Sequence, residues 1–155
     1  MTSSDQFTTK CLTSLPESED AQIKTLLREH NQAANPELWA KFETSEADPQ
    51  NLHVVSYTLT GELIGGLLAT TSLAWLKIDI MAVDEAYRGR GLGSQLLQAA
   101  EQEAIRRGCK YSFLDTMDYQ APQFYRQNGY TEAGSIADWD SHGHVKFYFT
   151  KALTG

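Results

Sequence analysis

The segment Arg88-Gly89-Arg90-Gly91-Leu92-Gly93 places the strongest constraint on how this chain folds. It lies between the most strand-like stretch of the sequence, residues 75–83, and a helical pattern that begins at Leu92. At such a junction, successive backbone N–H groups and the positive end of the helix dipole converge and favour an anion. Glycine lets the backbone approach a phosphate, and arginine donates charge-assisted hydrogen bonds. We therefore predict an α/β fold with an anion site at the start of this helix.

Two other phosphate motifs do not fit this segment. A dinucleotide-binding fingerprint that starts at Gly89 needs a glycine at position 94, which is Ser94. A P-loop needs Gly-Lys-Ser/Thr after a four-residue spacer, and the sequence has no such run. The remaining alternative is a glycine-rich turn that only joins strand to helix, although two arginines and three glycines exceed what a turn requires.

Hydrophobic periodicity predicts further elements on both sides of this segment. The two strands around the turn Thr60-Gly61-Glu62 should form a hairpin, whereas strands and helices alternate in the second half of the chain. This order predicts a mixed α/β sheet rather than a doubly wound one. The expected helices begin near Pro16, Leu38, Leu92 and Ala121, and the expected strands are 7–15, 52–59, 63–71, 75–83, 111–116, 130–136 and 145–153.

The composition is that of one ordinary globular domain. The chain has 155 residues, of which 41% are hydrophobic, and no linker or internal repeat divides it, so we expect a single domain over 1–155. Cys11 and Cys109 have no metal-binding spacing and fit a reduced compartment. Because there is neither a signal-peptide pattern nor a run of about 18 apolar residues, we expect a cytoplasmic protein without a membrane span.

The charge balance excludes nucleic acid as a partner. The chain has 13 Lys and Arg against 20 Asp and Glu, which gives a net charge of -7. The basic residues are scattered and form no patch for phosphate contacts along a nucleic acid. Loose acidic clusters at 17–20 and 37–48 favour a cationic partner, although a solvated acidic surface is the plainer explanation.

The spacing Arg88-x-x-Gly91-x-Gly93 resembles the coenzyme A signature of the GNAT family of N-acetyltransferases, which is Arg or Gln, two spacers, Gly, one spacer, and Gly or Ala. Two further segments match the family in order and spacing, namely the strand ending at 81–84 and the run 121–130, which holds Phe124-Tyr125 before Gly129-Tyr130. The resemblance is strong over residues 75–135. The first 50 residues match only in the order of their elements.

The resemblance implies a single-domain, mixed and largely antiparallel sheet of six to seven strands flanked by about four helices. It also implies acetyl-CoA as co-substrate, with the pantetheine arm bonded along the strand at Met81 and Val83. The alternative is that these two side chains only pack in the core. The residues that the signature assigns to the diphosphate are Arg88, Gly89, Arg90, Gly91 and Gly93, and Ser94 adds a hydroxyl unless it is an ordinary first-turn serine.

Tyr125 lies where family members carry the tyrosine that protonates the departing thiolate of CoA. A phenol with an ordinary pKa of about 10 stays protonated at neutral pH, and it can donate to a thiolate whose conjugate acid has a pKa of about 8.5. The resemblance therefore implies that Tyr125 is the general acid. The alternative is an aromatic packing residue like its neighbour Phe124.

Asp79 is the second catalytic candidate. A carboxylate between Ile78 and Ile80 in a central strand needs an ion-pair partner or has a functional role. Strict alternation puts it on the same, buried face as Met81 and Val83. We expect Asp79 to bind the acceptor amine or to take its proton, because only a neutral amine attacks a thioester. A structural salt bridge, to Lys77 or to a distant arginine, is the alternative.

Other candidate residues depart from the family pattern or lack a cue for chemistry. Asp118 stands seven residues before the tyrosine, where the family commonly has Asn, and Gln120 is a candidate to replace its hydrogen bond to CoA. His142 and His144 fit a polar turn better than a metal site, and we expect no metal. The two cysteines have no neighbouring cue for activation, which favours direct transfer in a ternary complex.

These features together predict an enzyme that acetylates a small cationic amine or a peptide amine. Its acceptor should depend on how residues 31–50 and 136–145 fold over the cleft. A homodimer in which the C-terminal strands pair is a further possibility. A non-catalytic acyl-CoA-binding regulator with the same fold remains the alternative function, whereas Ser94 and the opening hairpin disfavour a nucleotide-binding domain.

Overall fold

The computed structural model describes residues 7–154, which form two compact units, one ending at Ser45 and the other beginning at Glu46. The first unit contains α1 (Glu17–Ala34) and α2 (Pro36–Phe42). Proline and acidic residues start α1, as predicted, and the Asn35 side chain caps α2 by accepting from the Leu38 N–H at 3.2 Å. The Trp39 indole donates to the Arg28 carbonyl at 3.2 Å and joins the two helices.

The expected strand at residues 7–15 is wrong. These residues are exposed, and they form no ladder with any strand of the described chain. A strand needs a neighbour for its N–H and C=O groups, which the local apolar pattern of this segment cannot supply. The sheet therefore has six strands among residues 7–154, the lower end of the predicted range.

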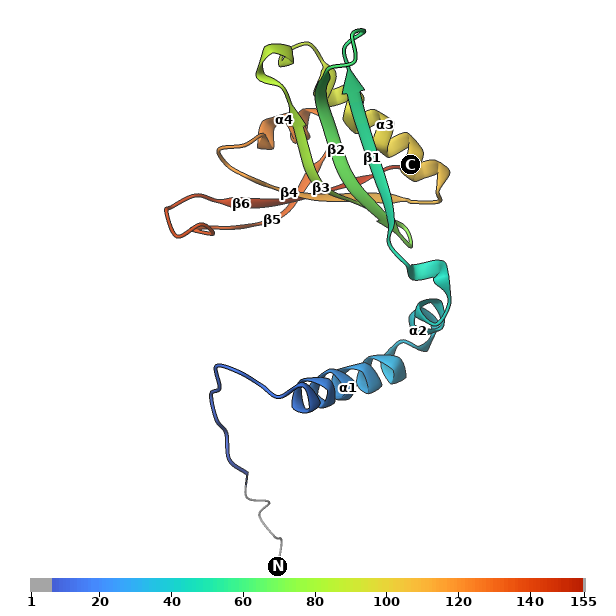
Figure 1. Ribbon diagram of the computed structural model, residues 1–155, viewed down its shortest axis with the longest axis vertical. Coiled ribbons are helices and arrows are strands. Elements are labelled where there is room, and N and C mark those ends of the chain that lie inside the picture. The colour runs from blue at the N-terminus through green and yellow to red at the C-terminus, as the bar shows by residue number, and fades with distance from the viewer. Residues whose placement is uncertain (1–6, 155) are drawn as a thin grey trace, which may run out of the picture. The chain divides into compact units, whose positions relative to one another are not determined.

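The second unit is built on a mixed sheet with the strand order β1-β2-β3-β4-β6-β5, shown in Figure 1. Only β3 and β4 pair in parallel, and the other neighbours are antiparallel. The predicted opening hairpin is present as β1 and β2, and a single turn of 3-10 helix, η1 (Ser45–Ala47), precedes it. The strands are β1 (Gln50–Tyr57), β2 (Leu63–Ser72), β3 (Trp75–Val83), β4 (Tyr111–Met117), β5 (Thr131–Ile136) and β6 (Lys146–Ala152).

β3 has a β-bulge at Asp79. In its register with β2, Ile78 lies opposite Ala69 and Ile80 lies opposite Leu68, so Asp79 is an extra residue without a partner on β2. A bulge of this kind leaves one residue unpaired and bends the strand locally. The strand consequently changes the alternation of its side chains at this point.

The bulge contradicts the predicted faces of β3. Past it, Met81 and Val83 pack against the hydrophobic core, whereas Ile80 is 57% exposed and the Asp79 side chain is 44% exposed. Asp79 therefore does not share a face with Met81 and Val83, and this part of the strand is not buried on both faces. Strict period-two alternation fails because a single extra residue moves every later side chain to the other face.

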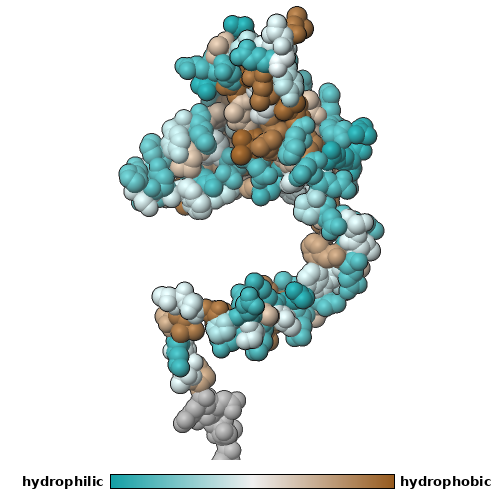
Figure 2. Space-filling model, in the orientation of Figure 1, coloured by the Kyte–Doolittle hydropathy of each residue, from teal (hydrophilic) through white to brown (hydrophobic). Residues whose placement is uncertain are grey.

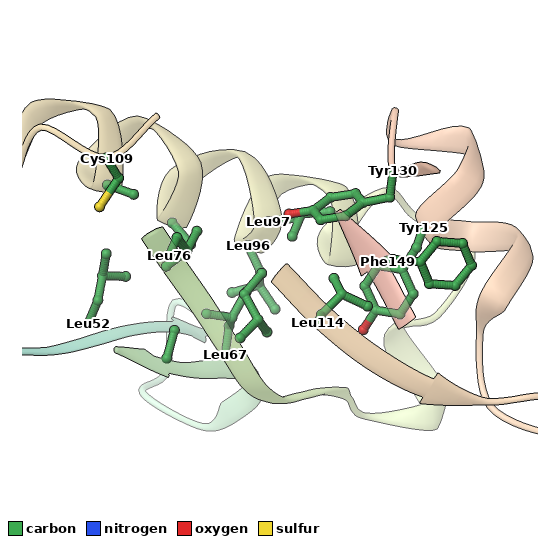
Figure 3. Close-up of a cluster of buried hydrophobic side chains, with 14 residues drawn as sticks. Leu52, Leu67, Leu76, Leu96, Leu97, Cys109, Leu114, Tyr125, Tyr130 and Phe149 are labelled. Atoms are coloured by element: carbon green, nitrogen blue, oxygen red, sulfur yellow. The ribbon is translucent and has the colours of Figure 1, made fainter. Parts of the chain in front are cut away.

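α3 (Leu92–Arg106) lies across β1, β2 and β3 and supplies the predicted apolar stripe. Figure 3 shows Leu96 and Leu97 of this helix pointing toward Leu67, Leu76 and Leu114 of the sheet, and all five are fully buried. Burying each such leucine contributes about 1.5–3 kcal/mol. A Cβ at position 65 would lie 3.2 Å from the Ala82 carbonyl oxygen of β3, so glycine relieves a close approach of β2 to β3.

The C-terminal half adds α4 (Pro122–Gln127) and the β5–β6 hairpin to the same core. Tyr125 of α4 and Phe149 of β6 belong to the cluster around α3. Because β6 lies between β4 and β5, both of its edges are paired within the chain, so its pairing with a second copy in a homodimer would need one of these ladders to open. Of the helices in residues 7–154, none combines the length and apolar character needed to cross a bilayer.

Candidate active site

The loop between β3 and α3 presents open backbone amides. The Asp84 carboxylate accepts from the Ala86 N–H at 2.8 Å and starts a short 3-10 turn, η2 (Glu85–Tyr87). Gly91 then caps α3 with a left-handed φ of +79°, a conformation that favours glycine. Within residues 7–154, no side chain caps the N-terminus of this helix. The first amides of α3 are therefore available to an anion.

The two arginines of the loop have different roles. The Arg88 Nε donates to the Val83 carbonyl at 3.1 Å, which ties the loop to the end of β3 and leaves the rest of the guanidinium beside the cavity. The Arg90 guanidinium lies 5.2 Å from the centroid of the Tyr87 ring, and Arg90 is not one of the residues that line the cavity. The structure thus brings Arg88, but not Arg90, to the predicted anion site.

Gly93 lies where α3 meets α4. A Cβ at this position would be 3.2 Å from Cζ of Phe124 and 4.0 Å from a methyl group of Val83. Only glycine fits here without moving the Phe124 ring, because 3.2 Å is closer than carbon atoms normally approach. The glycine spacing of the loop therefore serves both the approach of a ligand and the packing of α4.

A cavity of about 840 Å³ opens in front of this loop. It begins where the parallel pairing of β3 and β4 ends, at Ile78 and Leu114, and the strands separate beyond that point. Ligands of α/β proteins commonly bind outside the carboxyl ends of parallel strands. The predicted site residues that line the cavity are Asp79, Met81, Val83, Arg88, Gly89, Gly91, Gly93, Ser94 and Tyr125.

The cavity also contains residues that the sequence analysis missed. Asp115 and Thr116 come from the end of β4, whereas Tyr119 comes from the loop that leads to α4, next to the predicted Gln120. One signal pointed to Asp115, because it is a charged residue directly after the buried Leu114 at the carboxyl end of a strand. No comparable pattern marks Tyr119.

Tyr125 combines burial with a place on the cavity wall. It is 7% exposed, and its ring lies 5.9 Å from that of Tyr130 and 6.3 Å from that of Phe149. Burial raises the pKa of the Tyr125 phenol, and the negative charge of Asp115 raises it further. Among residues 7–154, no group forms a hydrogen bond with the hydroxyl, and Tyr125 lines the cavity.

The sequence matches the acetyltransferase (GNAT) family over residues 17–130, which is most of the chain. The chain belongs to the GNAT acetyltransferase family. It is 34% identical to an acetyltransferase of Agrobacterium fabrum over 122 residues, which cover 79% of this chain and 85% of the relative. It is 46% identical to the blasticidin-S acetyltransferase of Streptomyces morookaense over 80 residues, which cover 51% of this chain and 59% of that protein.

The fold agrees with this assignment. A crystal structure of an acetyltransferase from Bacillus cereus superposes with a TM-score of 0.73 at 30% identity, and the match covers 92% of this chain and 97% of that one. The predicted mixed, largely antiparallel sheet with four helices is therefore confirmed as the GNAT fold. The resemblance stated from the loop motif is likewise confirmed.

Asp79 of this acetyltransferase has the partner that the alternative interpretation required. The Lys77 ammonium lies 3.3 Å from its Oδ1, and the two side chains are 59% and 44% exposed. An exposed ion pair of this kind contributes little to stability. Asp79 therefore is not a buried charge that demands a catalytic explanation, but its side chain still lines the cavity.

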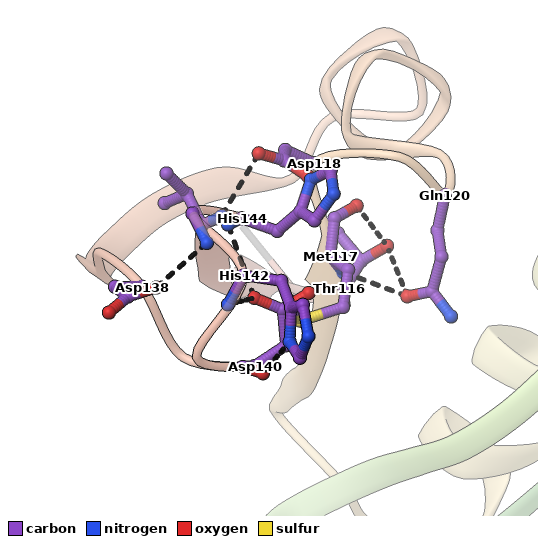
Figure 4. Close-up of polar contacts among 10 residues, drawn as sticks. Thr116, Met117, Asp118, Gln120, Asp138, Asp140, His142 and His144 are labelled. Atoms are coloured by element: carbon purple, nitrogen blue, oxygen red, sulfur yellow. Dashed lines mark hydrogen bonds and ion pairs between the residues drawn. The ribbon is translucent and has the colours of Figure 1, made fainter.

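Asp118 is engaged with the β5–β6 hairpin instead of the cavity. Figure 4 shows one oxygen paired with the His144 Nδ1 and the other accepting from the Val145 N–H, each at 2.9 Å. The Val145 N–H, followed by His144, lowers the pKa of the Asp118 carboxyl. Gln120 lines the cavity, and its Oε1 accepts from the Met117 N–H at 2.8 Å. Its side-chain NH₂ group remains to donate to a ligand.

The histidines and cysteines show no arrangement for other chemistry. The His142 Nδ1 lies 2.9 Å from the Asp140 carbonyl oxygen, and within residues 7–154 no three His, Cys, Asp or Glu side chains gather as a metal site. Cys109 is buried and desolvation raises the pKa of its thiol, whereas Cys11 is exposed. A thiol with a raised pKa is a poor nucleophile at neutral pH.

Proposed function

We propose that this acetyltransferase transfers the acetyl group of acetyl-CoA to a primary amine by direct attack in a ternary complex, with Tyr125 as general acid. The observation that carries the proposal is that one cavity holds both the uncapped start of α3 and the protonated Tyr125 phenol. The first feature suits a diphosphate and the second suits a departing thiolate. A cytoplasmic site of action belongs to the same proposal.

Different residues along the cavity bind different parts of acetyl-CoA. The first amides of α3 and the free guanidinium nitrogens of Arg88 hold the diphosphate, and the Ser94 hydroxyl adds a donor. The pantetheine arm follows β3 past Met81 and Val83, where the strand has separated from β4 and no longer uses all of its main-chain groups. Acetyl-CoA supplies an activated thioester at the inner end, beside Tyr125.

Proton transfer follows from the charges of the two candidates. Tyr125 donates its proton to the thiolate, because a phenol with a raised pKa is protonated at neutral pH. Asp79 binds the acceptor amine or takes its proton, directly or through water. The half-exposed position of Asp79 on the cavity wall supports this role, and its ion pair with Lys77 is weak enough to open.

Acetyl-CoA-dependent release of thiol tests this function. The amines to be offered are polyamines, amino acids, peptides and aminoglycosides, together with blasticidin S because of the relative named above. We expect at least one cationic amine to be acetylated. Tyr125→Phe should lower kcat about 10²- to 10⁴-fold, which is the usual contribution of general acid catalysis, while the KM for acetyl-CoA changes less than about twofold.

Tyr57→Phe is the matched control, because Tyr57 is an exposed tyrosine of β1 outside the cavity. It should keep the wild-type rate. Equal rates for Tyr125→Phe and the wild type would make Tyr125 a packing residue. Binding of acetyl-CoA in a calorimeter without acetylation of any amine would support the non-catalytic regulator instead.

A further inference from the structure

A second carboxylate, Asp115, lines the same cavity as Asp79. Ile78 and Leu114 form the last parallel pair of β3 and β4, and both side chains are buried with α3. Asp115, the next residue of β4, points to the opposite face because strand side chains alternate, and the half-exposed Asp79 at the bulge of β3 also turns away from the core. The cavity is therefore lined by Tyr125 from the helical face and by two carboxylates from the other face.

The surroundings of Asp115 already hold one cation. The Lys146 ammonium lies 3.2 Å from Asp115 Oδ1, 4.4 Å from the centroid of the Trp139 ring and 5.7 Å from that of Tyr148. Tyr148 is directly opposite Asp115 in the β4–β6 register and stacks on Phe113 with centroids 6.2 Å apart. A carboxylate beside aromatic faces is the arrangement that recognises ammonium and guanidinium groups.

This wall is also open to a ligand. The Asp115 side chain is 42% exposed, and its ion pair with Lys146 uses one of its two oxygens. Figure 2 shows apolar surface over the strands of the second unit, and Ile80, which lines the same cavity, is 57% exposed. A cation that also has an apolar chain can therefore contact both carboxylate and apolar surface on this face.

The geometry points to Asp115 as a specificity-determining residue that binds a second cationic group of the acceptor. This inference rests on the function proposed above. The reacting amine itself has to be neutral to attack, and a carboxylate stabilises the charged form of an amine that it binds. Asp115 consequently suits a group that stays charged through the reaction. The acceptor class is a primary amine that carries a second ammonium or guanidinium group.

Matched pairs of amines test this inference with the full-length protein. The dications 1,3-diaminopropane, 1,4-diaminobutane, 1,5-diaminopentane and agmatine are each compared with the monoamine of equal chain length. For the wild type, we expect kcat/KM for the best dication to exceed that of its monoamine at least tenfold. In Asp115→Asn this advantage should fall about tenfold to hundredfold, mainly through KM, because a charged hydrogen-bonded partner is lost.

Glu132→Gln is the matched control, because Glu132 also forms a surface ion pair, with Arg126 at 3.4 Å, outside the cavity. It should leave both amines unaffected. Lys146→Gln tests the sign of the effect. If Lys146 competes with the acceptor for Asp115, its removal should lower the KM for dications by up to about fivefold, the limit for an exposed ion pair. If the ion pair were structural, both variants would raise KM alike.

Each remaining outcome is decisive. Equal wild-type rates on monoamines and dications would overturn the inference and leave the proposed function intact. Equal slowing of both classes in Asp115→Asn would have the same meaning. If thermal melting shows that Asp115→Asn is not folded, Lys146→Gln decides instead, and an unimproved KM for dications would overturn the inference. Absence of thiol release with these amines and with the wider panel would instead reject the proposed function itself.

Discussion

The two ends of the cavity are built in different ways. The end proposed to bind acetyl-CoA comes from one continuous stretch, residues 81–94, and it presents mostly backbone groups, fixed by the left-handed Gly91 and by the close packing of Gly93 against Phe124. The end proposed to bind the acceptor comes from β3 and β4, and it presents charged side chains that are about half exposed, chiefly Asp79 and Asp115. A site made of backbone groups is suited to a single acetyl donor. A site made of side chains can change its amine acceptor through single substitutions.

Substitution of Gly93 should have the largest effect on this division. Gly93→Val should lower kcat/KM for acetyl-CoA about hundredfold, because the added methyl groups displace Phe124 and move the reacting atoms by about an ångström. The KM for the amine should change little. Gly134→Val is the control, since a Cβ there meets nothing within 4 Å. An unchanged kcat/KM for acetyl-CoA in steady-state kinetics would contradict the proposed difference between the two ends.

Asp79→Asn should have the next largest effect, at the acceptor end. We expect kcat/KM for the amine to fall about tenfold, equivalent to the loss of one charged hydrogen bond, and its pH dependence to shift. Lys77→Gln removes the same ion pair but keeps the carboxylate, so it should retain activity. If both variants lose activity equally across pH, then Asp79 is only a structural partner of Lys77.

The smallest expected effect is on the pH dependence of kcat, through the influence of the Asp115 charge on Tyr125. Burial and the Asp115 charge raise the pKa of Tyr125, so activity should increase with pH as the amine deprotonates, and decline only above the ordinary phenol pKa of about 10. Asp115→Asn removes the charge, and the alkaline decline should move to lower pH, although burial still delays it. A pH profile of kcat with an unmoved alkaline limb would mean that the two ends act independently.

The cofactor end could be predicted from the sequence because its determinants are local. Arg88-x-x-Gly91-x-Gly93 lies between a strand and a helix, and contiguous residues decide both where the amides point and where the backbone can be approached. The limits of β3 and the apolar stripe of α3 followed from periodicity for the same reason. Arg90 was included because of its charge, but its stacking on Tyr87 depends on the folded loop.

The acceptor end could not be predicted in this way. Asp79 is displaced by a bulge that is defined only by the register with β2, so alternation assigned the wrong face. Asp115 and Lys146 are 31 positions apart in sequence and meet only because β4 pairs with β6. Pairing between distant segments also decides that residues 7–15 form no strand and that β6 lies inside the sheet, so neither feature could be predicted from local sequence.

Initial-velocity kinetics with both substrates varied provide the most direct test of the central claim, that donor and acceptor occupy one cavity and react without a covalent enzyme intermediate. Direct attack requires a ternary complex, and the buried Cys109, whose thiol has a raised pKa, offers no acyl carrier. Double-reciprocal plots at several fixed amine concentrations should therefore give lines that intersect. Parallel lines, together with an acetylated protein in mass spectra before amine is added, would contradict the account.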